Sequence, residues 1–280
     1  MSKYLDITVM PLNRCFDRGR WRFYWQKVFR EGRPAPRELV ESEEKFWAEK
    51  IRSSGSNGLF CDITIGGRGS PLSQAQVWEV ERELKQHHPH IRFFPIWVKT
   101  RGDKDQKTAL REMEKTDFFT QEIDEMQRKG VFRLAIHSAK DLPDPLPEGL
   151  QLIAITKGLS SRDVLVLREG ESLSPGSRIG TSSDRRMAAI QALGSDLTII
   201  EIRGAIDVRL AALDKGEIDG LVVAQCALER LKEDHRNHIL LDGDVAPMQG
   251  RLAVVALSSD EEMNQIFRPL HHEAHSLSRQ

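Results

Sequence analysis

The sequence of 280 residues contains little cysteine and no long apolar run. Its three cysteines, Cys15, Cys61 and Cys226, lie far apart and lack the CxxC spacing of zinc or redox sites, so we expect reduced thiols. No stretch approaches the ~18 apolar residues that a membrane-spanning helix needs. The N-terminus also lacks the continuous apolar segment and small-residue cleavage site of a secretory signal. These absences predict a protein of a bacterial-type cytoplasm that does not enter a membrane.

An excess of either charge is also missing, because 41 lysines and arginines balance 42 aspartates and glutamates to a net charge of -1. Nucleic-acid-binding domains usually carry a strongly basic face, so no nucleic-acid partner is expected. What the sequence does have is 39% hydrophobic residues, enough to build a core, in a length typical of one or two compact domains. We expect a globular monomer.

Residues 1–57 differ in composition from the rest of the chain. They hold three of the five tryptophans, a predicted helix over 38–52 and a linker-like stretch over 53–58. We interpret them as an N-terminal extension whose aromatic side chains pack on the main body. The alternative is that the interleaved arginines and aromatics of 14–30 bind nucleic acid or a membrane surface.

After residue 60 the pattern becomes strand, turn and helix, repeated. The helix predicted over 70–88 begins with Ser70 as its N-cap and Pro71 at its first position. Strands are predicted over 61–67, 91–100, 132–138, 150–158, 163–167, 177–183, 197–204, 218–225 and 251–257, and further helices over 118–128, 185–193, 205–217 and 226–233. Alternation of this kind predicts α/β layers with mostly parallel sheets.

Two successive units of similar size predict two lobes with a binding cleft between them. We assign residues 58–157 and 248–262 to the first lobe, with the late strand over 251–257 crossing back to it. Residues 158–247 form the second, arginine-rich lobe, and residues 263–280 are left as a C-terminal helix.

The strand over 132–138 ends in the sequence HSAKDLP, which places Ser138, Lys140 and Asp141 where a strand gives way to a loop. Ligands of open α/β sheets bind at the carboxyl ends of strands. A lysine beside an aspartate at such a position is suited to a charged substrate, although the pair alone is more often a solvated turn.

Arginines recur at the junctions of the second lobe. Arg185 and Arg186 fall in the first turn of a predicted helix, where the positive end of the helix dipole makes two cations unfavourable unless an anion compensates them. Guanidinium groups bind carboxylates and phosphates through two bonds at once. Further arginines at such junctions are Arg68, Arg203, Arg209 and Arg230. Each alone favours a surface salt bridge, but together they predict a site for a polycarboxylate, with Asp141 available for charge stabilisation or proton transfer.

Several segments resemble the porphobilinogen deaminase (hydroxymethylbilane synthase) family, in order, over about residues 60–275. They include GGRGSPLSQAQ, KTRGDK, LAIHSAKDLPDPLPEGL, SRDVLVL, RIGTSSDRRMAAIQA, IEIRGAIDVRLAALDKGEIDGLVVA and APMQGRLAV. The series HSAKDLP, IGTSSxRR and RGxxxxRLxxLxxGxxD is highly specific. The resemblance implies two α/β lobes similar to those of type II periplasmic binding proteins.

The resemblance also implies roles for individual residues. Asp141 matches the catalytic aspartate of a family that removes ammonia from porphobilinogen, giving an azafulvenium cation that the growing pyrrole chain attacks. Such a carboxylate stabilises the developing positive charge. Residues matching positions that bind the dipyrromethane cofactor or the substrate are Arg68, Ser70, Gln76, Ser138, Lys140, Ser183, Arg185, Arg186, Arg203, Arg209, Arg230 and Gln249.

The sequence departs from the family pattern at three places. The family's GGKG loop is replaced by MEKTDFF, with Lys115 and Thr116 near the position of its lysine. The motif APGQGA reads APMQGR, so that Met248 replaces a glycine and Arg251 a small residue. The chain also ends where the family continues into a third domain, so we expect the usual cysteine that holds dipyrromethane to be absent.

The thiol nearest the predicted cleft is Cys226, which either holds the primer or is a small buried residue, the interpretation we favour. Other routes are a primer held by the arginines alone, or a partner chain that supplies the missing domain. His271, His272 and His275 have helical spacing, but no set of carboxylate or cysteine partners is evident, and we expect no metal site.

We therefore expect a transferase of heme (tetrapyrrole) biosynthesis that condenses four porphobilinogen molecules into hydroxymethylbilane. Its partners would be porphobilinogen and the oligopyrrole intermediates. The alternative is a non-catalytic protein of the same descent that binds pyrrole carboxylates or other anions.

Overall fold

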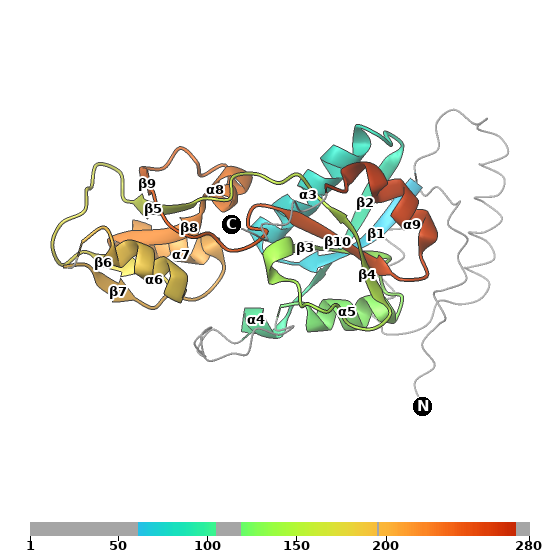
Figure 1. Cartoon of the computed structure of the whole chain (residues 1–280), viewed down its shortest axis with the longest axis horizontal. Coiled ribbons are helices and arrows are strands. Elements are labelled where there is room, and N and C mark those ends of the chain that lie inside the picture. Colours follow the sequence, from blue (N-terminus) through green and yellow to red (C-terminus); the bar gives the residue numbers. More distant parts are fainter. Residues whose placement is uncertain (1–60, 105–118, 195, 273–280) are drawn as a thin grey trace, which may run out of the picture.

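The computed structural model describes residues 61–104, 119–194 and 196–272, and it contains two lobes, each built on one five-stranded sheet (Figure 1). The α/β, two-lobed architecture expected from the sequence is confirmed. The predicted extension over 1–57, the loop with Lys115 and Thr116, Cys15 and His275 lie outside the described residues.

The first lobe has the strand order β2-β1-β3-β10-β4. Its strands are β1 (Cys61–Arg68), β2 (Ile91–Val98), β3 (Leu134–Ser138), β4 (Leu150–Ile155) and β10 (Leu252–Leu257), and its helices are α3 (Pro71–Lys85), α4 (Arg101–Lys104), α5 (Gln121–Arg128) and α9 (Glu261–Phe267). As predicted, α3 begins after the N-cap Ser70, whose side chain accepts a hydrogen bond from the Ser73 amide at 3.3 Å. Pro71 occupies the first turn, where its missing N–H costs nothing.

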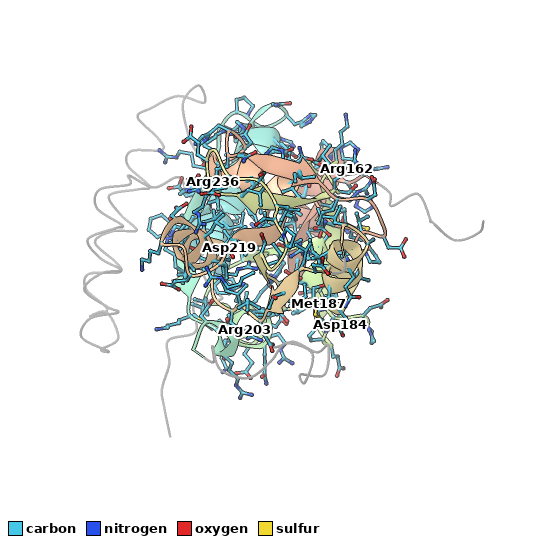
Figure 2. The ribbon with its side chains drawn as sticks, turned by 90° about the vertical axis from the view of Figure 1, so that its left-hand side faces the viewer. Arg162, Asp184, Met187, Arg203, Asp219 and Arg236 are labelled. Atoms are coloured by element: carbon cyan, nitrogen blue, oxygen red, sulfur yellow. The ribbon has the colours of Figure 1, made fainter. Side chains whose placement is uncertain are left out.

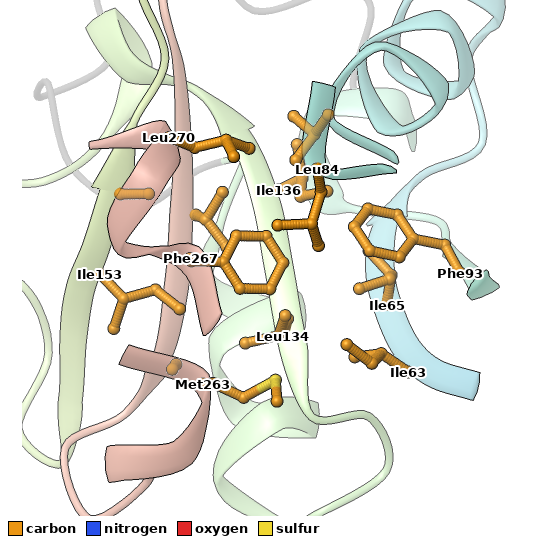
Figure 3. Close-up of a cluster of buried hydrophobic side chains, with 14 of the residues drawn as sticks. Ile63, Ile65, Leu84, Phe93, Leu134, Ile136, Ile153, Met263, Phe267 and Leu270 are labelled. Carbon is orange, nitrogen blue, oxygen red and sulfur yellow. The ribbon is translucent and has the colours of Figure 1, made fainter. Parts of the chain in front are cut away.

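The core of the first lobe lies between the sheet and helices α3 and α9 (Figure 3). Phe93 of β2 and Phe267 of α9 stack with their ring centroids 6.2 Å apart, and both are buried. Arg133 fastens α9 to the start of β3 through two bonds to Asp260 and one to Glu262. The segment after β10 therefore belongs to the packing of this lobe.

The second lobe has the strand order β7-β6-β8-β5-β9. Its strands are β5 (Asp163–Leu167), β6 (Arg178–Gly180), β7 (Thr198–Ile200), β8 (Gly220–Ala224) and β9 (His238–Leu240), and its helices are α6 (Asp184–Gln191), α7 (Ile206–Asp214) and α8 (Gln225–Leu231). The strand β9 was not predicted, because three residues carry no measurable periodicity.

The sheets are mixed, and the prediction of mostly parallel sheets was wrong. In the first lobe β10 runs antiparallel to both β3 and β4, and in the second β5 runs antiparallel to both β8 and β9. Both β5 and β10 enter their sheets from the other lobe. Such strands do not belong to a βαβ unit, the connection that makes neighbouring strands parallel.

The two segments that cross between the lobes, 156–162 and 241–251, lie against each other. The Leu159 amide donates to the Gly250 carbonyl at 3.2 Å. Gly250 has a φ of +88°, and a Cβ there would lie 2.6 Å from the Leu159 carbonyl oxygen, so only glycine fits. Met248 has a φ of 60°, a left-handed conformation that is rare for a residue with a side chain.

Candidate active site

The predicted catalytic turn follows β3 directly. A single 3-10 turn, Ala139–Asp141, leaves both Lys140 and Asp141 exposed to solvent. The turn is held to the start of β10 by a hydrogen bond from the Ala139 amide to the Arg251 carbonyl at 3.0 Å. The position of Asp141 is therefore set by backbone contacts, and its carboxylate stays available for a ligand.

Ser138 and Gln76, which were both predicted to bind a ligand, lie together. Gln76 is buried on α3 and donates from Nε2 to the Ser138 Oγ at 2.8 Å. Because the serine oxygen accepts this bond, its own proton remains available for another acceptor.

Lys140 links the turn to the return crossover. Its Nζ donates to the Gln249 Oε1 at 3.3 Å. Water still reaches the side chain, but the protein packed around the ammonium group lowers the pKa of Lys140; the Asp141 carboxylate opposes this shift and Arg186 adds to it. Lys140 of the first lobe thus lies within electrostatic range of the arginines of the second.

Arg185 and Arg186 both converge on Asp163, the first residue of β5. Arg186 donates from Nη2 and Nε to the Asp163 Oδ1 at 2.8 and 3.2 Å, and Arg185 Nη1 lies 2.6 Å from Oδ2. Burial alone would raise the pKa of Asp163, but the two guanidinium groups outweigh it and lower that pKa. The two arginines at the start of α6 were expected to need an anion, and the Asp163 carboxylate supplies part of that negative charge.

Arg203 and Arg209 complete a cationic cluster with Arg186. Arg209, on α7, has a pKa lowered to about 10, first by burial and then by the charges of Arg186 and Arg203. Its Nε is buried and has no hydrogen-bond partner among the described residues. Figure 2, a view onto the second lobe, shows Arg203 on the same side as Asp184 and Met187 of α6. Mutual repulsion in a poorly hydrated place favours the binding of an anion.

Arg68 has partners of its own at the end of β1. It is paired with Asp103 of α4, and its guanidinium carbon lies 4.5 Å from the centroid of the Phe119 ring. Burial raises the pKa of Asp103, but the bonds from Arg68 and Thr100 outweigh it and lower that pKa. The charge of Arg68 also reaches the buried His137, which precedes Ser138.

Two other predicted residues occupy helix starts. Ser70 caps α3 as described, and Ser183 precedes α6 without a hydrogen bond from its side chain to the helix. Both are partly buried.

Arg230 lies apart from the cationic cluster in its contacts. It donates to both oxygens of Glu79 on α3, each at 2.8 Å, and to the Gly250 carbonyl at 2.8 Å. Its guanidinium group is engaged by the protein, so its predicted contact with substrate stays a prediction.

Cys226 is the second residue of α8 and is 5% exposed. Burial raises the pKa of its thiol. A thiol is nucleophilic as the thiolate, so this environment suits a small buried residue better than an attachment point.

Sequence reasoning did not single out Asp163, Asp103, Phe119 and Glu79 as functional candidates. Asp163 and Asp103 lie in the segments SRDVLVL and KTRGDK. The sequence signal that could have pointed to them is the number of arginines for which no acidic partner had been assigned. Within the described ranges no group of three or more histidine, cysteine and acidic residues has metal-binding geometry, and no helix is long and apolar enough to cross a bilayer.

Comparison with known proteins identifies the family. Residues 63–265 match the family described as porphobilinogen deaminase, dipyromethane cofactor binding domain. A porphobilinogen deaminase of Deinococcus radiodurans is 38% identical over 221 residues, covering 76% of this chain and 72% of the relative. A probable porphobilinogen deaminase of Chlamydia pneumoniae is also 38% identical over 221 residues, covering 76% of this chain and 93% of the relative.

Among solved structures, a periplasmic binding protein of an arginine transport system from Legionella pneumophila aligns with a TM-score of 0.42 and 12% identity, over 74% of this chain and 91% of that one. The family match and the relatives' identities, together with the arginines and the aspartate turn described above, lead to one conclusion: the chain belongs to the porphobilinogen deaminase family.

Proposed function

We propose that this protein is a transferase that removes ammonia from porphobilinogen and joins four of the resulting pyrroles into hydroxymethylbilane. The observation that carries the proposal is the cluster of Arg186, Arg203 and Arg209, in which burial, and then the charges of the other two arginines, lower the pKa of Arg209 to about 10. Porphobilinogen carries an acetate and a propionate, so each pyrrole brings two carboxylates to such a cluster. Family membership supports the same substrate class.

In this proposal Asp141 acts on the ring while the arginines hold its acidic side chains. Positive charge develops on the pyrrole as the amine departs, and a nearby carboxylate at the pyrrole N–H stabilises it. The 3-10 turn presents Asp141 to solvent and anchors its backbone to β10, which suits a residue that meets a ligand. Lys140, beside it, would contact an acidic side chain of the ligand.

The donor set also fits dipyrromethane, whose two pyrroles carry the same acidic groups. The residues that would hold it are Arg203, Arg209, Ser138 and Lys140. Arg209 has a donor to offer, because its buried Nε has no hydrogen-bond partner among the described residues. When bound, this group supplies the pyrrole position to which the first substrate unit is joined. The arginines and Ser138 bind and orient its carboxylates.

Turnover of porphobilinogen by the full chain tests the proposal. Loss of porphobilinogen is followed with Ehrlich's reagent, and product is measured as uroporphyrin after oxidation. Asp141→Asn is expected to lower kcat by at least about 100-fold, because it removes the charge that stabilises the transition state. The matched control is Asp144→Asn, an equally conservative change at an exposed residue three positions further on, which should change kcat by less than about 2-fold.

Binding without turnover would instead support the non-catalytic alternative. Calorimetry with porphobilinogen, run beside the turnover assay, separates the two hypotheses. A non-catalytic protein would bind porphobilinogen without converting it, and Asp141→Asn would then have no activity to change. Intact mass of the purified protein shows whether two pyrrole units are attached, and peptide mapping shows whether Cys226 carries them. An adduct elsewhere, or none, would remove Cys226 from consideration.

A further inference from the structure

Asp163 occupies the position where the second lobe begins. It is the first residue of β5, directly after the crossover over 156–162, and it pairs with Ala224 of the central strand β8. Its backbone carbonyl accepts a hydrogen bond from the Leu241 amide at 3.0 Å. The side chain is 5% exposed. Asp163 is therefore a rigid, buried carboxylate at the junction of the lobes.

Among the described residues, the polar partners of this carboxylate are all residues that the sequence assigned to ligand binding. Oδ1 accepts from Arg186, as described, and from the Gln249 Nε2 at 3.0 Å, while Oδ2 faces Arg185. The two charged hydrogen bonds to Oδ1 hold the guanidinium plane of Arg186 in one orientation, whereas Arg185 meets Oδ2 as an ion pair, without hydrogen-bond geometry. Arg186 uses Nε and Nη2 on Asp163, and Nη1 donates to the Val222 carbonyl at 3.5 Å, which leaves one N–H on each Nη for a ligand.

Gln249 extends the contacts to the catalytic turn. Its Nε2 donates to the Ser161 carbonyl at 2.6 Å as well as to Asp163, and its Oε1 accepts from Lys140. An amide has donors on one side only, so these partners fix its orientation. A continuous series of bonds thus runs from Lys140 in the first lobe to Arg186 in the second.

We propose that Asp163 is a positioning residue that orients Arg185 and Arg186 for substrate carboxylates and, through Gln249, sets them relative to Lys140. This rests on the proposed function, because the substrate is the ligand being positioned. Asp163 itself does not touch substrate. Its charge also balances two cations beside a cluster in which a further arginine already has a lowered pKa.

A matched control exists in the same lobe. Asp219 also binds two arginines, with Arg178 Nη2 at 3.0 Å and Arg168 Nη2 at 3.4 Å, but it precedes β8 and so lies at the other end of the β5–β8 pair. Asp163→Asn and Asp219→Asn therefore each remove one carboxylate charge from a pair of arginines, at side chains that are 5% and 27% exposed. Only the first alters the junction of the lobes.

The test compares kcat/KM for porphobilinogen in these variants and in a double-mutant cycle with Arg186→Gln. We expect Asp163→Asn to lower kcat/KM by at least about 10-fold and Asp219→Asn by less than about 2-fold. In the Arg186→Gln background, Asp163→Asn should cost no more than about 3-fold, because its effect passes largely through that arginine. Independent, multiplying effects of the two substitutions would overturn the proposal, as would equal losses in both aspartate variants.

A second measurement does not depend on turnover or on the folding of Asp163→Asn. In the wild-type protein the ¹⁵N–¹H signal of the Arg186 Nε, assigned with Arg186→Lys, should be protected from exchange and should stay so when porphobilinogen is added. Loss of protection on binding would show that Asp163 only occupies the site until substrate displaces it, and would refute positioning. If the wild-type protein neither binds nor converts porphobilinogen, the proposed function fails, while protection of the free protein's Arg186 signal still decides whether Asp163 holds it.

Discussion

Glu79 and Arg230 join the two lobes through a buried, two-bond ion pair. Glu79 projects from α3 of the first lobe and Arg230 from α8 of the second, with Nε–Oε2 and Nη2–Oε1 distances of 2.8 Å. Their side chains are 6% and 3% exposed. Arg230 also donates to the Gly250 carbonyl of the return crossover, so one guanidinium group connects both lobes and the segment between them.

Breaking this pair is expected to destabilise the protein. Glu79→Gln removes the carboxylate to which the buried Arg230 is bonded and should lower the free energy of unfolding by about 3 kcal/mol in urea titrations. Glu125→Gln, which breaks an exposed pair with Lys129, should cost less than about 0.5 kcal/mol. Replacing both Glu79 and Arg230 by methionine should recover most of the loss, and failure to do so would mean that the ion pair is not its cause.

Arg209 is expected to reduce stability while serving function. Burial and the charges of Arg186 and Arg203 lower its pKa, so Arg209→Gln should raise the free energy of unfolding by roughly 1–3 kcal/mol. The same variant should weaken porphobilinogen binding by at least about 10-fold, measured by calorimetry. Arg162→Gln, at an exposed pair with Asp242, should change neither quantity appreciably. A destabilised Arg209→Gln protein would contradict this mutual repulsion of the arginines.

Acid is expected to destabilise the protein through His137. Burial, and then the charge of Arg68, lowers its pKa from 6.5 to about 4, so between these values the unfolded chain binds a proton that the folded protein does not. The stabilising contribution is complete above pH 6.5 and is lost as the pH falls towards 4. From pH 7 to pH 5 the loss should be about 2 kcal/mol. His137→Gln should show a correspondingly smaller change over this interval; an unaltered pH dependence would contradict it.

Met248 and Gly250, both at positive φ in the return crossover, should respond oppositely to substitution. A left-handed residue with a side chain costs roughly 1–2 kcal/mol, partly offset by the greater freedom of glycine in the unfolded chain. Met248→Gly should therefore raise the free energy of unfolding by about 0.5 kcal/mol, measured as a slightly higher melting temperature. Gly250→Ala should lower the free energy of unfolding by about 2 kcal/mol or more, because the new Cβ would meet the Leu159 carbonyl. Equal responses at the two positions would rule out this explanation.

Local patterns were sufficient to predict most elements of the described lobes. The cap at Ser70 is made by neighbouring residues, and so is the placement of Arg185 and Arg186 at the start of α6, so both can be read along the chain. The direction of β5 and β10 in their sheets was not predictable in this way. It depends on which lobe each strand enters from, and that is a long-range property.

The same division holds for the site. By itself the sequence determined the chemical inventory: Asp141 in a turn after a strand, and a set of arginines at the ends of strands and the starts of helices. Tertiary structure decided which charges meet, for Asp163 is 86 residues from Gln249 and Glu79 is 151 from Arg230, yet each pair is in contact. Ion pairs act over a few ångströms of space whatever the distance along the chain, so the partners of the arginines emerge only when the lobes are assembled.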